Sequence, residues 1–321
     1  MRAVVLREYG GPAALRVEEV PIPEPGPGQV RIRVHASAMN NSDLQTTEGR
    51  YGRPPLPRIM GQEAAGIVDA LGEGVTALQP GMRVVGHVWE SWAEYAVAPA
   101  QELVPLPEAV SFEAAATLPI ASYTASMALV SAARLQPGEW VLISPGTGGV
   151  GVIAVQLAQL LGGRVIATTS AAAKRPLLSE LGAQLVLNWA TDDVVAEVLR
   201  ATAGEGVPVA LDGGGTVTFA HCLASLTNAG RLVVYGYTTG MEATVPIGRL
   251  LTRNITIFGI AIWTNPAYWD NVAFFRERVL PAVAAGQIRT IVESVVPLEH
   301  AGDGLRLLAE RRVSGKVVIT P

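Results

Sequence analysis

The sequence holds a single cysteine, Cys222, among 321 residues. One thiol excludes an internal disulfide bond and any zinc site built from several cysteines. Only 16% of the residues are charged, the net charge is −4, and there is no long basic run, so the chain lacks the electrostatic footprint of a protein that binds nucleic acid or an anionic membrane. No stretch approaches 18 uninterrupted apolar residues, which excludes a membrane-spanning helix.

The first residues, MRAVVLREYGG, do not contain the apolar core of a signal peptide. We therefore expect a cytoplasmic protein. Hydrophobic residues make up 49% of the chain, which is ample for a large core and argues against disorder. The length allows two domains or one large domain.

Residues 1–110 predict short strands separated by turn-forming residues, a pattern typical of a compact, mostly antiparallel barrel or sandwich. The predicted strands are residues 2–6, 15–20, 30–36, 66–71 and 82–88.

From about residue 115, apolar strands alternate with amphipathic helices, which predicts an α/β fold with a doubly wound parallel sheet. The predicted strands are residues 140–144, 164–168, 185–188, 208–212, 231–236 and 255–260. The predicted helices are about 149–161, one that ends at 181–183, 192–202 and about 217–227. The segment from about 288 predicts two further strands and a helix that belong to neither half.

A glycine-rich turn follows the first strand of this second half. Gly146, Gly148 and Gly151 satisfy G-x-G-x-x-G between strand WVLIS and its helix, where such glycines let the backbone approach a dinucleotide pyrophosphate. The helix N-terminus adds free N–H groups and a partial positive charge. The turn residues expected to bind the cofactor are Gly146, Thr147, Gly148, Gly149 and Val150.

The residues after the second strand predict which dinucleotide binds. An NAD site usually has Asp or Glu there to hold the ribose 2′-hydroxyl, but no acid occurs from 164 to 179, where Ser170, Lys174 and Arg175 gather instead. A hydroxyl and cations suit a 2′-phosphate, which a carboxylate would repel. The sequence therefore favours NADP(H). The alternative is that Lys174 and Arg175 simply open a solvated helix.

Short motifs recur in order along nearly the whole chain. They are PEPGPGQV (23–30), NNSD (40–43), GRYGRPPLPRIMGQEAAGIV (49–68), GMRV (81–84), WAEYAV (92–97), AATLPIASYTA (115–125), GTGGVG (146–151), LGA (181–183) and GKVVI (315–319). This series resembles the zinc-free branch of the medium-chain dehydrogenase/reductase superfamily, most closely the ζ-crystallin-like quinone oxidoreductases. The resemblance implies a GroES-like catalytic domain, residues 1–117 and 261–321, with a Rossmann domain, residues 118–260, inserted into it.

The same resemblance bears on metal binding. Zinc alcohol dehydrogenases have G-H-E where this chain has Gly61-Gln62-Glu63, and their histidine and a cysteine near position 39 or 40 bind the metal. Here Gln62 replaces the imidazole, and no cysteine lies near position 39 or 40. Because zinc requires such nitrogen and sulfur ligands, we expect no metal.

Without a metal, reduction of a quinone or an α,β-unsaturated carbonyl is the easier chemistry, since the enzyme need only position the reactants and offer a hydrogen-bond donor. By resemblance, Asn40 and Asp43 form the N-x-x-D motif beside the nicotinamide. Tyr51 points into the cleft and donates to the substrate oxygen, unless it merely packs on its Pro-rich loop. Gln62 fills the vacated metal position, and Glu63 braces the loop.

Further cofactor contacts are expected from the resemblance and from the carboxyl ends of the strands. They are Thr124 at the nicotinamide face, Trp189 beside the adenosine, Gly213 and Gly236 after two strands, Tyr237 over the ribose, and Phe258 with Gly259 beside the carboxamide. Thr124 has the alternative role of a local helix cap. The strand ITIFGIAI also resembles the edge through which the family forms homodimers.

Two questions stay open from sequence. Trp89, Trp92, Trp263 and Trp269 either line the mouth of the cleft, which favours flat apolar substrates, or serve packing. The expected partner is a small molecule, a quinone or enone. One alternative is a 2-enoyl thioester reductase, for which Arg50, Arg53 and Arg58 offer a basic patch. Another is a non-catalytic protein that binds NADPH.

Overall fold

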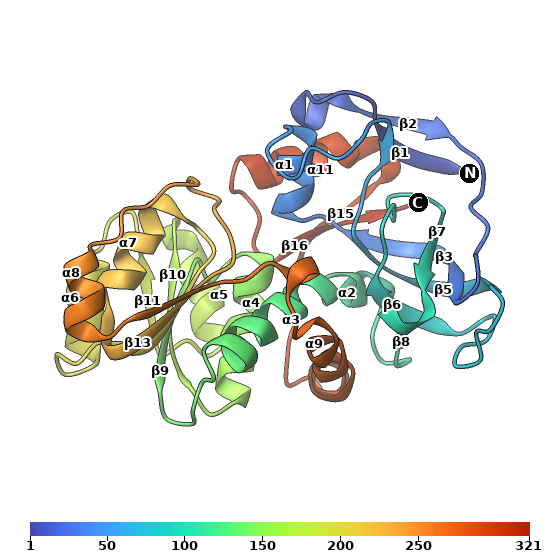
Figure 1. The fold of residues 1–321 in the computed structure, drawn as a ribbon. Coiled ribbons are helices and arrows are strands. Elements are labelled where there is room, and N and C mark those ends of the chain that lie inside the picture. The colour runs from blue at the N-terminus through green and yellow to red at the C-terminus, as the bar shows by residue number, and fades with distance from the viewer. The chain divides into compact units, whose positions relative to one another are not determined.

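The computed structural model describes residues 1–321, which form two compact units. The first unit comprises residues 1–120 and 290–321, and the second comprises residues 121–289. Figure 1 follows the chain through both units and back into the first, where both termini lie.

The first unit contains two sheets. A three-stranded sheet has the order β2-β1-β4, formed by β2 (Leu15–Glu19), β1 (Arg2–Leu6) and β4 (Arg58–Ile59). The larger sheet runs β15-β16-β3-β5-β6-β8, with β7 paired to β3. Its strands are β3 (Gln29–Ala38), β5 (Glu63–Leu71), β6 (Arg83–His87), β7 (Tyr95–Pro99), β8 (Leu103–Pro105), β15 (Val292–Pro297) and β16 (Lys316–Thr320).

The pairings of these strands are antiparallel except for β15 with β16. Strand β3 shows why the sequence pattern predicts them, because Val30, Ile32 and Val34 alternate with more exposed residues and face one core. Strand β16 pairs with β3, which explains why the last segment fitted neither half of the chain. The helices of this unit are α1 (Asn41–Thr47), α2 (Phe112–Ala116) and α11 (Ala301–Ala309).

The second unit is a six-stranded parallel sheet in the order β11-β10-β9-β12-β13-β14. This is the strand order of dinucleotide-binding folds, so the expected doubly wound α/β fold is confirmed. The strands are β9 (Trp140–Ser144), β10 (Arg164–Thr169), β11 (Leu185–Asn188), β12 (Val207–Asp212), β13 (Leu226–Val234) and β14 (Thr256–Gly259).

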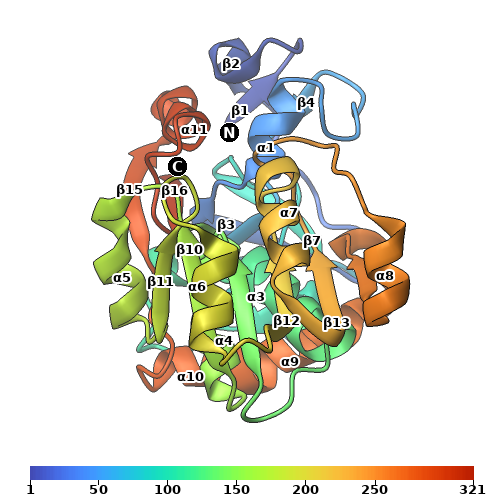
Figure 2. The same cartoon turned by 90° about the vertical axis from the view of Figure 1, so that its left-hand side faces the viewer.

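Helices cover both faces of this sheet. They are α4 (Gly149–Leu160), α5 (Arg175–Glu180), α6 (Val194–Ala201), α7 (Thr216–Ala224) and α8 (Ile247–Arg253). Figure 1 shows α4 and α5 on one face and α6, α7 and α8 on the other, and Figure 2 looks onto the latter. The centre of strand β9 is apolar because both faces of the sheet are covered: Val141, Leu142 and Ile143 are all fully buried. Each such side chain contributes about 1.5–3 kcal/mol to folding.

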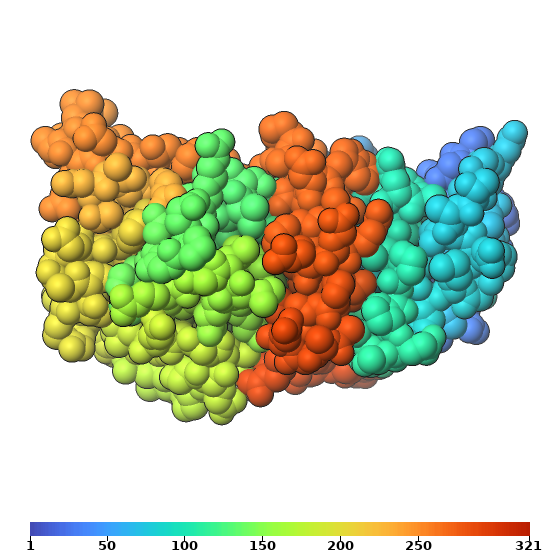
Figure 3. All heavy atoms as spheres, turned by 90° about the horizontal axis from the view of Figure 1, so that it is seen from below, coloured from blue at the N-terminus to red at the C-terminus, as the bar shows by residue number.

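The units differ from the predicted domain limits at residues 118–120, which belong to the first unit, and at residues 261–289, which belong to the second. The latter segment contains helices α9 (Tyr268–Phe274) and α10 (Leu280–Ala284), which pack in the second unit. The ring of Phe275 meets the edge of the Tyr123 ring at 5.6 Å between centroids, and Asn271 Nδ2 donates to Ser131 Oγ at 3.2 Å. In the space-filling view this orange segment reaches the surface (Figure 3). None of the helices combines the length and apolar character needed to cross a membrane.

Candidate functional site

The N-x-x-D residues lie at the start of a helix rather than in an open loop. Helix α1 begins at Asn41, and Asn40 is its N-cap residue. The backbone N–H of Asn40 donates to Asp43 Oδ2 at 2.8 Å, so the carboxylate satisfies a donor at the helix start. Asp43 is thus held relative to Asn40 by a contact within three residues of the chain.

Gln62, the residue directly before β5, directs its amide nitrogen toward helix α1. Nε2 donates to Asp43 Oδ1 and to Ser42 Oγ, both at 2.8 Å. Because an ionised carboxylate only accepts hydrogen bonds, the nitrogen must face Asp43. Both amide protons are used in this way. The group that Gln62 can offer to a ligand is therefore its oxygen, an acceptor.

Asp43 itself is only 1% exposed. Burial raises the pKa of its carboxyl group from 3.8 to about 6, while the hydrogen bonds from Gln62 and Asn40 act in the opposite direction. Both of its oxygens are engaged by those two residues. The negative charge of the Asp43 carboxylate therefore lies behind the Gln62 amide.

Glu63 braces the same loop, as the sequence indicated, through a partner that the sequence analysis missed. Lys316 Nζ contacts Glu63 Oε1 and donates to Asn40 Oδ1 at 2.6 Å. Asn40 Nδ2 donates to the same Glu63 oxygen at 2.8 Å, and Glu63 Oε2 accepts the N–H of Ile120 at 2.9 Å. The one sequence signal for this ion pair was Lys316 at the start of the apolar strand KVVIT. A lysine buried there needs a carboxylate partner.

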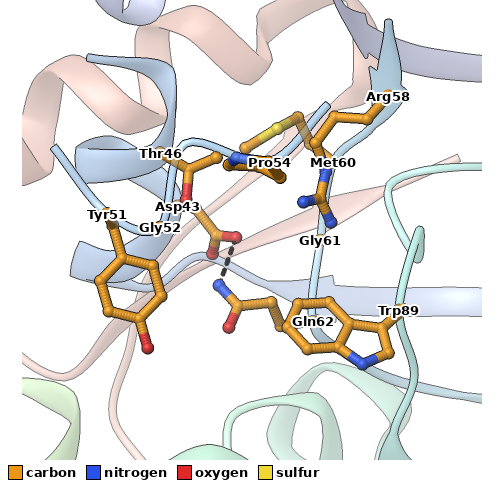
Figure 4. A pocket seen from close by; sticks show the side chains of 10 residues that line it. All are labelled: Asp43, Thr46, Tyr51, Gly52, Pro54, Arg58, Met60, Gly61, Gln62 and Trp89. Atoms are coloured by element: carbon orange, nitrogen blue, oxygen red, sulfur yellow. Dashed lines mark hydrogen bonds between the residues drawn. The ribbon is translucent and has the colours of Figure 1, made fainter. Parts of the chain in front are cut away.

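A pocket of about 120 Å³ opens beside these groups (Figure 4). It is lined by Asp43, Thr46, Tyr51, Gly52, Pro54, Arg58, Met60, Gly61, Gln62 and Trp89. Three of the four residues expected to be catalytic, Asp43, Tyr51 and Gln62, thus meet in one place. The fourth, Asn40, lies behind Asp43, to which it is hydrogen-bonded. Their catalytic roles stay predictions.

The three arginines of the Pro-rich segment do not form one basic patch. Arg50 pairs with Glu48, Arg53 lies 5.4 Å from the centroid of the Tyr9 ring, and only Arg58 lines the pocket. Of the three arginines suggested for a coenzyme A phosphate, the pocket therefore includes one, and the enoyl thioester reductase stays an alternative.

The four tryptophans also differ in their surroundings. Trp89 lines the pocket, whereas Trp92 is fully buried in a hydrophobic cluster with Leu6 and Met60 and is a packing residue. In the second unit, Trp263 and Trp269 both contact the ring of Tyr268, at 6.0 and 5.0 Å between centroids.

In the second unit the glycine-rich turn has the features of a pyrophosphate cradle. A Cβ at Gly151 would lie 2.4 Å from the carbonyl oxygen of Pro145, and one at Gly146 would lie 3.0 Å from Ala167 Cβ. Gly151 is therefore needed for close packing of helix α4 on the turn, and Gly146 for close packing of the turn against β10 and α5. A Cβ at Gly148, the N-cap residue, would meet nothing within 4 Å. Open space over backbone N–H groups at a helix start suits an anionic ligand, so these residues fit the cofactor.

The other predicted cofactor residues lie mostly at one edge of the sheet. Because all six strands are parallel, residues that end or follow them share the carboxyl edge. Ser170, Trp189, Gly213, Gly236, Tyr237 and Phe258 all have such positions. Thr124 does not: it is the sixth residue of α3 (Pro119–Ser126) and 5% exposed, so the alternative of an N-terminal cap is wrong.

Two of these glycines have a packing reason of their own. A Cβ at Gly213 would lie 2.5 Å from the Tyr235 ring, and one at Gly236 would lie 2.7 Å from the carbonyl oxygen of Gly213. The ends of β12 and β13 therefore approach too closely for larger residues. Close packing alone therefore accounts for glycine at positions 213 and 236, independently of a cofactor.

The two cations after β10 differ in their surroundings. Arg175 Nη2 pairs with Asp192, which also accepts the N–H of Asn188 at 2.8 Å. The hydrogen bond from Asn188, with further help from Thr191 and Arg175, lowers the pKa of Asp192. Arg175 is thus neutralised by the chain itself. Lys174, at the end of the short 3-10 helix Ala172–Lys174, stays the predicted ligand of a 2′-phosphate.

Asp212 is a buried acid at this edge that the sequence analysis did not select. It is fully buried at the end of β12, and burial raises its pKa to about 6. Its Oδ1 accepts the N–H of Gly214 at 3.1 Å and the hydroxyl of Thr218 at 2.5 Å, and its Oδ2 accepts the N–H of Gly215 at 3.2 Å. These bonds hold the turn into α7. The sequence signal that could have identified Asp212 was its position directly after the strand residues PVAL.

A zinc ion does not fit the residues of the pocket. Protein zinc sites use three or four thiolate, imidazole or carboxylate ligands in tetrahedral geometry, whereas this pocket offers a single carboxylate beside one amide, one phenol and one aliphatic hydroxyl group. The carboxylate is already engaged at both oxygens.

Comparison with known proteins covers the whole chain. The model described as "Alcohol dehydrogenase GroES-like domain" matches residues 26–108, and that described as "Zinc-binding dehydrogenase" matches residues 149–277. Quinone oxidoreductase-like protein 2 of Rattus norvegicus is 33% identical over 324 residues, covering 99% of this chain and 92% of that protein.

Two solved structures are similar over the full length of both chains. Quinone oxidoreductase of Escherichia coli, solved in complex with NADPH, has a TM-score of 0.94 and 27% identity. An NAD-dependent alcohol dehydrogenase has a TM-score of 0.91 and 35% identity.

Proposed function

This chain belongs to the quinone oxidoreductase family of the medium-chain dehydrogenase/reductase superfamily, and from that premise we propose that it is a metal-free, NADPH-dependent reductase of quinones or α,β-unsaturated carbonyl compounds. The observation that carries the proposal is the pocket in which Tyr51, Gln62 and Asp43 meet without a thiolate or an imidazole. A site of this composition has no strong Lewis acid to lower the pKa of an alcohol, which disfavours alcohol oxidation.

The cofactor, when bound, supplies the hydride. Tyr51 is the group that donates a hydrogen bond or proton to the substrate oxygen as negative charge develops there. Gln62 does not serve as that donor, since its amide protons are used by Ser42 and Asp43. Its oxygen instead accepts from a water molecule or hydroxyl group and so orients it. Asp43 and the Glu63–Lys316–Asn40 network keep the amide in this position.

The choice of NADPH rests on two supports. Ser170 and Lys174 follow β10, where an acid selective for NAD is absent. The similar E. coli enzyme was solved with NADPH. Arg175 contributes less than the sequence indicated, because Asp192 neutralises it.

The test is cofactor oxidation by chelator-treated protein, with a flat ortho-quinone, a simple enone and an enoyl-CoA as acceptors and NADH as the control cofactor. We expect turnover of the quinone or enone that prefers NADPH and survives the chelator. Fast turnover of the enoyl-CoA with a weak response to the others would favour an enoyl thioester reductase. Tight NADPH binding without turnover of any acceptor would favour a binding role.

The proposal includes a homodimer through β14. This strand is the last in the sheet order, so one of its edges has no strand partner within the chain. Beside it, Ile247 and Leu251 of α8 are 68% and 72% exposed, and apolar side chains so exposed often mark an interface. Light scattering after size-exclusion chromatography checks this: a mass of 33.6 kDa, that of one chain, would contradict the dimer.

A further inference from the structure

Arg58 is a cation of the pocket that no acidic side chain neutralises. It begins β4, lines the pocket, and forms no salt bridge. Its Nε is buried without a hydrogen-bond partner. The donors open to an external anion are therefore the terminal nitrogens of the guanidinium group, which is directed into the pocket.

We propose that Arg58 binds a carboxylate of the substrate, so that this site acts on electron-poor unsaturated carbonyl compounds that carry a carboxylate. The inference rests on the proposed function, which it narrows from quinones and enones in general to acidic ones. It assigns to Arg58 the role of a specificity-determining residue.

The neighbours of Arg58 leave its charge available. The guanidinium carbon lies 5.8 Å from the centroid of the Trp89 ring. Stacking on a ring uses the face of a guanidinium group and leaves its edge N–H groups free for an anion in the same plane. Figure 4 shows the group directed into the pocket.

The nearest acid does not compensate this charge. Asp43 lines the same pocket, but its Oδ1 accepts from Gln62 and its Oδ2 from the N–H of Asn40. Of the other arginines of the segment, Arg50 pairs with Glu48, and neither Arg50 nor Arg53 lines the pocket. Arg58 is therefore the arginine of this segment that can meet an anion in the pocket.

The walls of the pocket suit a carboxylate that also carries an unsaturated carbonyl group. The volume of the pocket is about 120 Å³. Pro54, Met60 and Trp89 provide apolar walls for the carbons, and Tyr51 provides a hydroxyl for a carbonyl oxygen. The fork of an arginine matches a planar carboxylate with two parallel hydrogen bonds.

The first experiment compares a 4-oxo-2-alkenoic acid with its methyl ester as acceptors for NADPH. We expect the wild-type protein to prefer the acid by at least about 10-fold in kcat/KM, and added salt to reduce this preference. Arg58→Met should lower kcat/KM for the acid about 10–100-fold and leave the ester within about 3-fold. Arg58→Lys should restore part of the loss, because it keeps the charge but not the fork.

Arg53→Met is the matched control, since Arg53 lies on the same segment but does not line the pocket. It should keep the wild-type preference. An equal or faster rate with the ester in the wild-type protein would overturn the inference while leaving the proposed function intact. So would an equal loss for acid and ester in Arg58→Met, because it would place Arg58 on the carbonyl oxygen instead.

The second experiment measures binding without turnover, using the saturated 4-oxoalkanoate and the fluorescence of the tryptophans, one of which stacks on Arg58. We expect wild-type protein to bind the acid and Arg58→Met to lose at least about 10-fold in affinity. If no acceptor is reduced but this Arg58-dependent binding is found, the proposed function fails and the anion site stands. Absence of binding to wild-type protein, or displacement of the acid by equimolar inorganic phosphate, would overturn the carboxylate assignment.

Discussion

Glu63 and Lys316 are 253 positions apart in the chain and form an ion pair whose side chains are 0% and 5% exposed. Asn40 bonds to both members. The pair therefore links β5, β16 and the start of α1 beneath the candidate site. A buried pair of this kind stabilises the arrangement only as long as both charges are present.

Removal of one member of the pair should be strongly destabilising. We expect Lys316→Met to lower the free energy of unfolding by about 3–5 kcal/mol, because Glu63 is left buried without its counter-charge. The double variant Glu63→Gln/Lys316→Met should lose less than the sum of the two single variants. Urea unfolding of the four proteins measures the coupling. Arg200→Met, which breaks an exposed pair with Glu197, is the control and should change little. Additive losses would show that the two side chains do not interact.

The buried carboxyl of Asp43 predicts how stability depends on pH. In the native state Asp43 keeps its proton up to about pH 6. In the unfolded state, where its pKa has the ordinary value of 3.8, the proton is already lost well below that pH. Between these values the native state binds more protons than the unfolded state, so the free energy of unfolding falls as the pH rises from about 4 to about 6. The full difference corresponds to about 3 kcal/mol.

Asp43→Asn should remove the part of this pH dependence that comes from Asp43. Asp212→Asn should remove a second part, since burial also raises the pKa of Asp212. Urea unfolding at several values from pH 4 to pH 7 is the measurement. Asp270→Asn, at an exposed position of α9, should leave the slope unchanged. A wild-type stability that increases over this interval, with no effect of either variant, would show that these two groups do not control it.

Tyr51 is the hydrogen-bond donor of the proposed mechanism. Tyr51→Phe should lower kcat about 10²–10⁴-fold with the preferred acceptor, while KM for NADPH changes little. Steady-state kinetics with each substrate varied in turn separates the two effects. Tyr95→Phe, on β7 and outside the pocket, should retain wild-type kcat. Retention of most activity by Tyr51→Phe would reassign the donor role.

Two glycines of the cofactor turn should respond differently to alanine. Gly151→Ala should destabilise the second unit, because the new Cβ would lie 2.4 Å from the Pro145 carbonyl oxygen. Gly148→Ala meets no protein atom within 4 Å, so we expect near wild-type stability but a rise of at least about 10-fold in KM for NADPH. Thermal unfolding and cofactor titration distinguish these outcomes. Normal cofactor affinity in Gly148→Ala would place the pyrophosphate elsewhere.

Lys174 should determine the preference for a 2′-phosphate. We expect Lys174→Ala to raise KM for NADPH about 10-fold and to leave KM for NADH unchanged, since only the former carries the phosphate that a cation stabilises. Arg175→Ala should have a smaller effect because Asp192 already pairs with that arginine. Arg200→Ala controls for loss of surface charge. Parallel changes for both cofactors would contradict the assignment.

The fold of the second unit was predictable because its signals are local. Apolar runs of four to six residues alternate with helices, and the structure has strands at all six predicted places. Only their ends differ, as in β13, which begins at Leu226 rather than at 231. The pocket residues Asp43, Tyr51 and Gln62 were predictable for another reason, because they lie in short motifs that resemble those of the family.

The sequence by itself determined the class of the fold, the glycine turn and the candidate residues Asp43, Tyr51 and Gln62. The fold class and the glycine turn depend on periodicity and short spacing, and the three candidate residues depend on the resemblance to the family. The tertiary structure decided which charges remain available. Only folding could bring Lys316 to Glu63, Asp192 to Arg175 and the ring of Trp89 to Arg58. Charge neutralisation depends on distance in space, and β pairing between segments far apart in the chain sets that distance.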